Sequence, residues 1–350
     1  MIGLLIAALV STVVSLVATR AVILFFRNRG KGQPILGKDE KNLIAVDHQH
    51  KAGTPTMGGI AILVAALTGY LVAHIREGIV FSDQAQIVWL GIALMAGVGF
   101  VDDFLKVKRM RNRGVFWRVK NLIVLALAAV PVILLVTTTE IATTISFTRA
   151  DWPGWDLGVP VWVVFSTFIV YATTHAVNVT DGLDGLAGGA ALFAFLAFTV
   201  VAFWGFRNPD LYDIVNPLDL AVLAVALAGA CAGFLWFNAA PAKVFMGDVG
   251  ALGLGAGLAL LALTTQTQLL LPLLCAINVI EIGSVAIQMG VYKASGRTRR
   301  VFRMSPIHHH FEVVGWPETT VIIRFWLIAG GFVAIALGIY IADFTRMARL

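Results

Sequence analysis

Long apolar runs recur along the whole chain and constrain its fold more than any other feature. They occupy roughly 2–26, 57–74, 85–101, 117–139, 159–177, 186–205, 218–237, 249–264, 269–290 and 320–342. About 20 apolar residues in a helix span the hydrocarbon core of a bilayer. Lipid offers no partner to an open backbone N–H or C=O group, so such segments must be helical. The sequence therefore predicts an all-α, polytopic integral membrane protein with about ten transmembrane helices.

Composition supports the same class. Apolar residues make up 59% of the chain and charged residues only 13%, which excludes a soluble globular domain of this size. Cys231 and Cys275 both lie within apolar runs, so we interpret them as small buried hydrophobic residues. We find no cleavable signal sequence, repeat, long linker or low-complexity tail, and we expect one helical transmembrane domain over residues 1–350.

The connecting segments differ in positive charge. One set of loops holds 19 of the 26 Lys and Arg residues, whereas the opposite set, with both termini, holds five. The basic set comprises 27–51, 102–120, 178–186, 238–248 and 291–319. Cytoplasmic loops concentrate Lys and Arg. We therefore expect this set in the cytoplasm and both termini on the periplasmic or extracellular side.

Carboxylates gather at the predicted cytoplasmic ends of the apolar segments. Asp102 and Asp103 lie in "FVDDFLK", Asp181 and Asp184 in "NVTDGLDGLAGG", and Asp248 in "FMGDVG". Each pattern alone has an ordinary explanation: a solvated pair at a helix end, two acids on one helix face, or an N-cap. Acids at membrane depth are costly unless they pair, bind a cation or line a wet cavity. Their occurrence on one side favours a Mg²⁺ site, because Mg²⁺ takes carboxylate and phosphate oxygens.

Two further motifs on this side suit phosphate. In "HKAGTPTMGG", Lys51 precedes a proline turn and a span. Free N–H groups at the start of that helix favour phosphate, and Lys51 would supply a positive charge to a diphosphate. In "RVFRMSPIHHHFE", one or two of His308, His309 and His310 would hydrogen-bond a phosphate or transfer a proton. Three consecutive histidines cannot all point one way on a helix, which argues against a His₃ zinc site. The ordinary alternatives are positive-inside anchoring with a proline turn for Lys51, and a surface loop or an incidental metal-binding tract for the histidines. The arginines just before the histidines would attract an anionic substrate or anchor to lipid headgroups.

With these motifs, the chain resembles the phospho-N-acetylmuramoyl-pentapeptide transferase family, a branch of the polyprenyl-phosphate N-acetylhexosamine-1-phosphate transferase superfamily. The motifs are "GTPTMGG" (53–59), "VDDFLK" (101–106), "NVTDGLDGLAGG" (178–189), "NAAPAKVFMGDVGAL" (238–252) and "SPIHHHFE" (305–312). The resemblance implies a Mg²⁺-dependent phosphoglycosyl transferase. It would move phospho-MurNAc-pentapeptide from UDP-MurNAc-pentapeptide to undecaprenyl phosphate, giving lipid I and UMP. It also implies the bacterial cytoplasmic (inner) membrane, a cytoplasmic site, a homodimer and no nucleic-acid partner.

The resemblance implies roles for single residues. It assigns the metal to Asp248 and catalysis to Asp248, Asp102, Asp103 and His308, with Asp102 preferred for positioning or deprotonating the lipid phosphate. The implied substrate-binding residues are Lys51, Thr56, Asn178, Asp181, Asp184, Asn238, Phe245, Gln288, His309 and His310.

Two mechanisms and three other classes of protein stay open at this point. Direct attack by the lipid phosphate is favoured over a covalent aspartyl intermediate, because the acceptor is already ionised at pH 7. A GlcNAc-1-phosphate transferase would share the Asp motifs but not the triple histidine. A cation-coupled transporter needs ionisable residues at span centres, where only Glu281 lies, and Glu281 can equally be a buried structural residue. A UbiA-like prenyltransferase has no use for the histidine segment.

Overall fold

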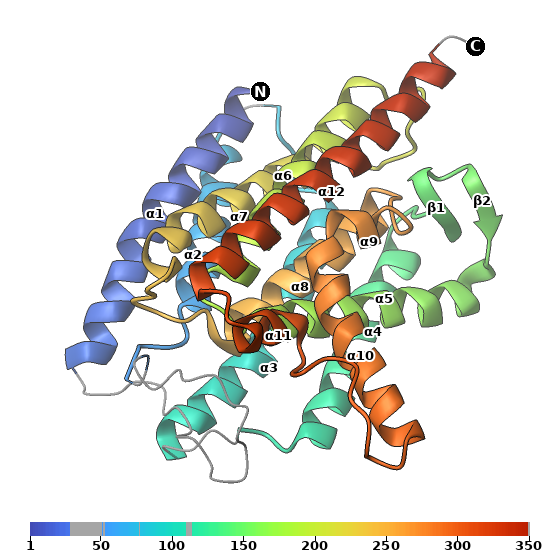
Figure 1. Ribbon diagram of the computed structural model, residues 1–350. Helices are drawn as coiled ribbons and strands as arrows, with labels where there is room; N and C mark the ends of the chain where they lie inside the picture. The colour runs from blue at the N-terminus through green and yellow to red at the C-terminus, as the bar shows by residue number, and fades with distance from the viewer. Residues whose placement is uncertain (29–50, 52, 77, 110–113, 349–350) are drawn as a thin grey trace.

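The computed structural model describes residues 1–28, 51, 53–76, 78–109 and 114–348, and these form a bundle of helices (Figure 1). The helices are α1 Ile2–Asn28, α2 Gly59–Ala73, α3 Asp83–Arg109, α4 Trp117–Thr138, α5 Gly158–Thr180, α6 Leu186–Arg207, α7 Pro217–Asn238, α8 Gly247–Thr264, α9 Leu271–Leu274, α10 Ala276–Ala294, α11 Ile307–Val314 and α12 Glu318–Met347. An antiparallel hairpin, β1 Thr144–Arg149 and β2 Trp152–Asp156, joins α4 to α5.

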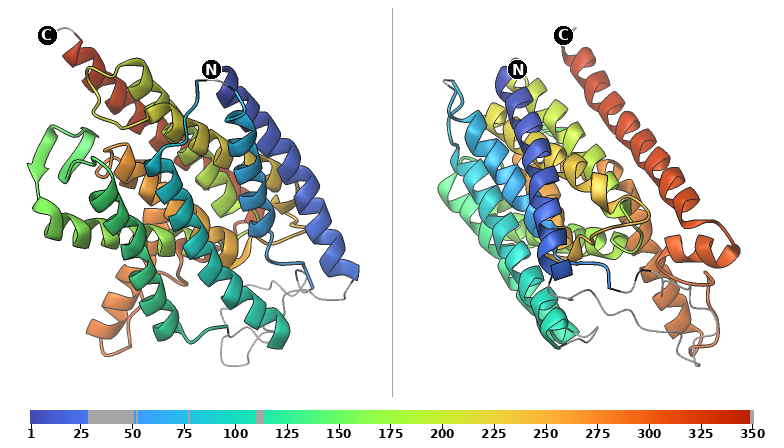
Figure 2. Two further views of the ribbon diagram at one scale, coloured as in Figure 1. Left: turned by 180° about the vertical axis from the view of Figure 1, so that it is seen from behind. Right: turned by 90° about the vertical axis from the view of Figure 1, so that its left-hand side faces the viewer.

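Within the described ranges, eight helices are long and apolar enough to cross a membrane, and α2 is a shorter apolar helix. The prediction of a helical, polytopic membrane protein is therefore confirmed, with the hairpin as a small exception that apolar runs do not reveal. Both termini lie at the same end of the bundle, away from the end at which α3 stops and α11 lies (Figures 1 and 2). The number of spans and their orientation in a membrane stay predictions.

The centre of the bundle is α8, whose residues from Val249 to Thr264 are all buried. Helices α2, α3 and α5 pack against it, and α7 packs between α1 and α6. Two glycines make the closest approaches possible. A Cβ on Gly59 of α2 would overlap the backbone of Gly250, and one on Gly99 of α3 would overlap the backbone of Asp248. Small residues let helix backbones approach in a membrane bundle, and these contacts bring the motif-bearing ends of α2, α3 and α8 together.

Some boundaries differ from the sequence prediction where they affect the candidate site. Helix α3 continues to Arg109 and α5 to Thr180, so Asp102, Asp103 and Asn178 lie on helices, not in loops. The apolar segment 269–290, predicted as one span, is divided between α9 and α10. The sequence does not show the break at Cys275, because the residues on both sides of it are apolar. Most of the predicted loop 27–51, and residues 110–113, lie outside the described residues.

Candidate active site

Three carboxylates meet where α3 packs against the start of α8. Asp102 and Asp103 lie on α3, and Asp248 lies in the first turn of α8. One oxygen from each lies within 4.8 Å of the others, and Asp102 and Asp103 are each only 2% exposed. The expected convergence of these three acids is present. Asp102 also accepts a hydrogen bond from Val115 N (2.7 Å), and Asp103 one from Val249 N (3.2 Å).

Two lysines balance this negative charge. Lys106 Nζ lies 2.7 Å from Asp102 Oδ2, 3.4 Å from Asp103 Oδ1 and 3.1 Å from Asp248 Oδ2. Lys120, near the start of α4, forms an ion pair with Asp248 and lies 3.5 Å from Asp102 Oδ2. Buried carboxylates require such partners, because an unpaired buried charge is strongly destabilising. Sequence reasoning missed Lys120, whose only signal is a basic residue at the start of an apolar segment.

The motif before α2 is tied to the motif before α8 by the backbone. Gly58 N donates to Phe245 O (2.9 Å), Gly59 N to Met246 O (2.8 Å), and Phe245 N to Pro55 O (2.8 Å). Thr56 is buried beside Gly247, below the surface of the site. The two motifs therefore form one rigid wall, although about 190 positions separate them in the chain.

A turn between α5 and α6 carries Asp181 and Asp184. The two residues lie in the turn, so the ordinary explanation that two acids share one helix face does not apply to them. Asp184 accepts hydrogen bonds from Lys51 Nζ (2.8 Å) and Ala242 N (2.9 Å). Lys51 Nζ also lies 2.5 Å from Glu318 Oε1, a second partner that sequence reasoning missed. Burial, together with the carboxylates of Asp248, Asp103 and Asp184, raises the pKa of Asp181 to about 7.

Two polar pockets open on either side of the acids. The turn pocket, of about 280 Å³, is lined by Lys51, Asp103, Lys106, Asp181, Gly182, Leu183, Asp184, Asn238, Phe245, Gly247, Asp248 and His309. The α4 pocket, of about 930 Å³, is lined by Asp102, Lys106, Gly114, Val115, Phe116, Trp117, Lys120, Asn121, His175, Asn178 and Asp248. Lys106 and Asp248 belong to both. Asn178 Nδ2 donates to Asp248 Oδ1 (3.0 Å) and orients that carboxylate between the two pockets.

The remaining predicted residues divide between the pocket walls and supporting positions. Asn238 donates to Val244 O (2.8 Å), and among the described residues its buried Oδ1 has no partner. Gln288 lines neither polar pocket. It accepts hydrogen bonds from Val301 N (2.9 Å) and Phe302 N (3.0 Å), so it holds the segment that follows α10.

The three histidines point in different directions, as their spacing predicts. His309 lines the turn pocket and lies 2.7 Å from Glu312 through Nδ1. His310 Nδ1 accepts a hydrogen bond from Arg303 N (3.1 Å). His308 is fully buried behind the wall of the turn pocket, and its Nδ1 lies 2.9 Å from Glu281 Oε2.

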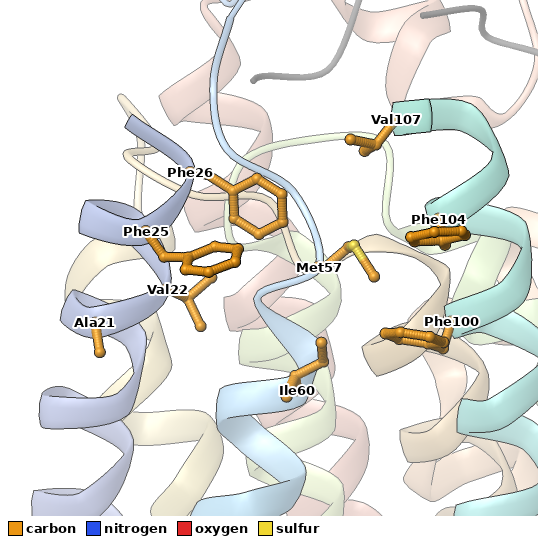
Figure 3. A pocket seen from close by; sticks show the side chains of 9 residues that line it. All are labelled: Ala21, Val22, Phe25, Phe26, Met57, Ile60, Phe100, Phe104 and Val107. Carbon is orange, nitrogen blue, oxygen red and sulfur yellow. The ribbon is translucent and has the colours of Figure 1, made fainter. Parts of the chain in front are cut away.

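An apolar pocket of about 540 Å³ flanks this region on the other face of α3 (Figure 3). Side chains of α1, the start of α2 and α3 surround it, and Phe100 and Phe104 stack with ring centroids 6.1 Å apart. Its lining residues are Ala21, Val22, Phe25, Phe26, Met57, Ile60, Phe100, Phe104 and Val107. Such walls suit hydrocarbon and offer nothing to a nucleotide.

This geometry can be compared with known proteins. A family model described as glycosyl transferase family 4 matches residues 85–266, and a phospho-N-acetylmuramoyl-pentapeptide-transferase signature matches residues 51–63. The phospho-N-acetylmuramoyl-pentapeptide-transferase of Frankia casuarinae is 44% identical over 356 residues, which cover 98% of each chain. The proteins of that name from Corynebacterium efficiens and Mycobacteroides abscessus are each 43% identical and cover 97% of this chain. They align over 98% and 96% of their own lengths.

The chain belongs to the phospho-N-acetylmuramoyl-pentapeptide transferase family. The resemblance stated from the motifs is thereby confirmed, and with it the class of transferase. The matched signature contains Lys51 and Thr56, and the matched family region runs from α3 through α8, so it contains Asp102, Asp103 and Asp248.

The acidic cluster of this family member has the chemistry of a divalent-cation site. Asp102, Asp103 and Asp248 supply only carboxylate oxygens, the hard ligands that Mg²⁺ prefers. The spacing of their oxygens lets them share one ion. Lys106 and Lys120 lie close enough to exchange their pairing with the acids for pairing with phosphate oxygens.

Proposed function

We propose that the protein transfers phospho-MurNAc-pentapeptide from UDP-MurNAc-pentapeptide to undecaprenyl phosphate, forming lipid I and UMP. Its full-length similarity to transferases of that name supports the proposal. The structural observation that carries it is the shared wall of the two polar pockets, where Asp248 and Lys106 face both cavities. Two substrates bound on either side of that wall would place their phosphates next to each other.

The turn pocket suits the soluble donor. Phe245 offers an aromatic face, and the amide oxygen of Asn238, which has no partner among the described residues, would accept a hydrogen bond from the imide N–H of uracil in the same pocket. Lys51 supplies a positive charge for the diphosphate. Asp181, Asp184 and the histidine segment form the rest of this wall.

The α4 pocket suits the lipid acceptor. Lys106, Lys120 and His175 line it and would bind the phosphate, with Asp102 positioned to orient it. Phe116 and Trp117 lie at this pocket, 60% and 61% exposed, and offer an apolar path into the bilayer for the polyprenyl chain. The apolar pocket of Figure 3 is the alternative location for the chain.

We further propose that Asp248, with Asp102 and Asp103, holds Mg²⁺. The ion would neutralise charge on the diphosphate and make UMP a better leaving group. The chain's own residues supply positioning and charge, which dominate phosphoryl transfer. Asp102 and Lys120 would direct an acceptor phosphate oxygen at the sugar-linked phosphorus of the donor, and Lys106 would stabilise the charge that develops between them. An O–P bond forms as the bond to the UMP oxygen breaks, so no covalent enzyme intermediate is required.

The location in the membrane follows the same proposal. The basic loops and the polar pockets would face the cytoplasm of a bacterial inner membrane, with both termini on the opposite side and ten spans between them. Positive charge concentrated at the pocket end supports this orientation. A homodimer is proposed from family membership alone.

Product formation by purified protein tests the function. With UDP-MurNAc-pentapeptide, undecaprenyl phosphate and Mg²⁺, we expect UMP and lipid I in equal amounts. UDP-GlcNAc in place of the donor should give neither product. UMP release with UDP-GlcNAc but not with the pentapeptide donor would instead assign the protein to the sister transferases. Trapped phospho-MurNAc on the enzyme without acceptor would contradict direct attack.

A further inference from the structure

Glu281 is the acid that lies farthest inside a predicted span, and the proposed chemistry does not use it. It sits on α10 with no exposed surface, one turn and a half from the start of the helix. Burying a carboxylate costs free energy unless a partner compensates. The side chain therefore requires a specific explanation.

That partner is the first histidine of the histidine segment. Glu281 Oε2 lies 2.9 Å from His308 Nδ1, and His308, in the first turn of α11, has no exposed surface either. An ionised carboxylate can only accept hydrogen bonds, so an ionised Glu281 requires the proton of this contact on Nδ1. The contact therefore fixes which ring nitrogen faces α10 and leaves Nε2 on the opposite edge of the ring.

The opposite edge of the ring faces the turn pocket. His308 Nε2 is so close to Gly182 that a Cβ at this position would collide with it. Gly182 is itself exposed and lines the pocket. Gly182 therefore lies between the imidazole and the pocket, and it has no side chain to fill the space between them.

The ring atom next to Gly182 has an unused hydrogen-bonding capacity. Among the described residues, His308 Nε2 has no hydrogen-bond partner although it is buried. A polar atom left unpaired in this way is costly. A polar group of a substrate bound at the pocket wall could supply the missing hydrogen-bond partner of Nε2.

We propose that Glu281 is a positioning residue for the donor site. It holds His308 in one tautomer and orientation, so that Nε2 forms a hydrogen bond with a polar group of the bound diphosphate substrate beside Gly182. Glu281 itself touches no substrate. This inference rests on the proposed function, because it concerns the pocket assigned to the donor. Carboxylates that orient a functional histidine commonly act in this way, and their loss lowers activity about 10- to 100-fold.

A purely structural brace between α10 and α11 is the competing explanation, and kinetics separate the two. Glu281→Gln preserves the shape and removes the charge. We expect kcat/KM for UDP-MurNAc-pentapeptide to fall about 10- to 100-fold, with KM for undecaprenyl phosphate and the thermal midpoint close to wild type. A brace alone would lower the midpoint and leave kinetics per folded enzyme unchanged. Ser284→Ala is the matched control, because within the described part of the chain its buried hydroxyl donates to Glu281 O (2.7 Å) of the same helix and to no other helix.

A double-mutant cycle tests whether Glu281 acts through His308. If it does, Glu281→Gln combined with His308→Asn should be no slower than His308→Asn alone. Additive losses, or wild-type kinetics of Glu281→Gln, would overturn the proposal. If Glu281→Gln does not fold, Glu281→Asp takes its place in the cycle.

A measurement independent of turnover uses histidine labelled with ¹⁵N in purified wild type and Glu281→Gln, with His308→Asn to assign the signal. We expect one Nδ1-protonated form of His308 in wild type and a mixture of tautomers in the variant. Identical spectra would refute the positioning role. Absence of UMP release by wild type would refute the proposed function instead, so the two failures are distinguishable.

Discussion

Lys120 on α4 forms an ion pair with Asp248 on the first turn of α8, although 128 positions separate them in the chain. The same lysine lies 3.5 Å from Asp102. It therefore links the helix that follows the double aspartate to the acid that faces both polar pockets. Lys120 and Lys106 therefore lie where, in the proposed reaction, the phosphates of the two substrates would meet.

Removal of this lysine should affect the acceptor more than the donor. For Lys120→Met we expect KM for undecaprenyl phosphate to rise and kcat to fall by about 10²-fold or more, since a positive charge beside the transferred group is lost. Lys120→Arg should recover part of the loss. The measurement is initial-rate UMP release with each substrate varied in turn. A selective rise in donor KM would place Lys120 on the other substrate.

Asp248 should be the most sensitive acid. Asp248→Asn keeps the size of the side chain and removes one charge from the proposed Mg²⁺ site. We expect turnover to fall on the order of 10³-fold and the Mg²⁺ concentration for half-maximal rate to rise. Asp343→Asn is the control, because Asp343 lies near the C-terminal end of α12 and binds Arg149 (2.9 Å) instead. Near-normal turnover of Asp248→Asn would contradict the metal assignment.

The path of the polyprenyl chain can be decided with two aromatic substitutions. Trp117 lies at the α4 pocket, whereas Phe104 lines the apolar pocket of Figure 3. Trp117→Ala should raise KM for undecaprenyl phosphate several-fold, and Phe104→Ala should leave it unchanged. Both variants should keep the wild-type KM for a short, water-soluble prenyl phosphate. The reverse pattern would move the chain to the apolar pocket.

The raised pKa of Asp181 predicts a pH-dependent stability. Burial and neighbouring carboxylates raise its pKa from 3.8 to about 7, so between these values the folded state binds more protons than the unfolded state. Stability contributed by this group therefore falls as pH rises through this window and is constant above it. Without divalent cations, Asp181→Asn should raise the thermal midpoint at pH 8, with a benefit that shrinks towards pH 4. Equal benefits at both pH values would contradict the assignment, and exposed Asp210→Asn is the control.

The sequence predicts the helices well and their contacts poorly. Runs such as those of α6 and α7 are long and apolar enough to be recognised directly, and the acids of α3 and α8 could be expected together because both fall on the basic side. Lys120 could not be assigned to Asp248, because that pairing depends on how α4 packs, not on any local pattern. The hairpin at 144–156 and helix α11, which carries the three histidines, are too short to show a recognisable hydrophobic periodicity in the sequence. The partnership of Glu281 with His308 likewise requires the path of the chain between α10 and α11.

The close contact of α3 with α8 offers a test of how the acids are brought together. Gly99→Ala would place a methyl group against the backbone of Asp248, which cannot move as a flexible side chain would. We expect a loss of about 1–3 kcal/mol in stability from overpacking and a larger loss of activity, because Asp102 and Asp103 lie on the next turn of the same helix. Gly97→Ala is the matched control: it lies on the same helix and its Cβ would meet nothing within 4 Å. Thermal midpoint and UMP release should both separate the two variants. Equal behaviour of Gly97→Ala and Gly99→Ala would show that α3 and α8 are farther apart in solution than this contact requires.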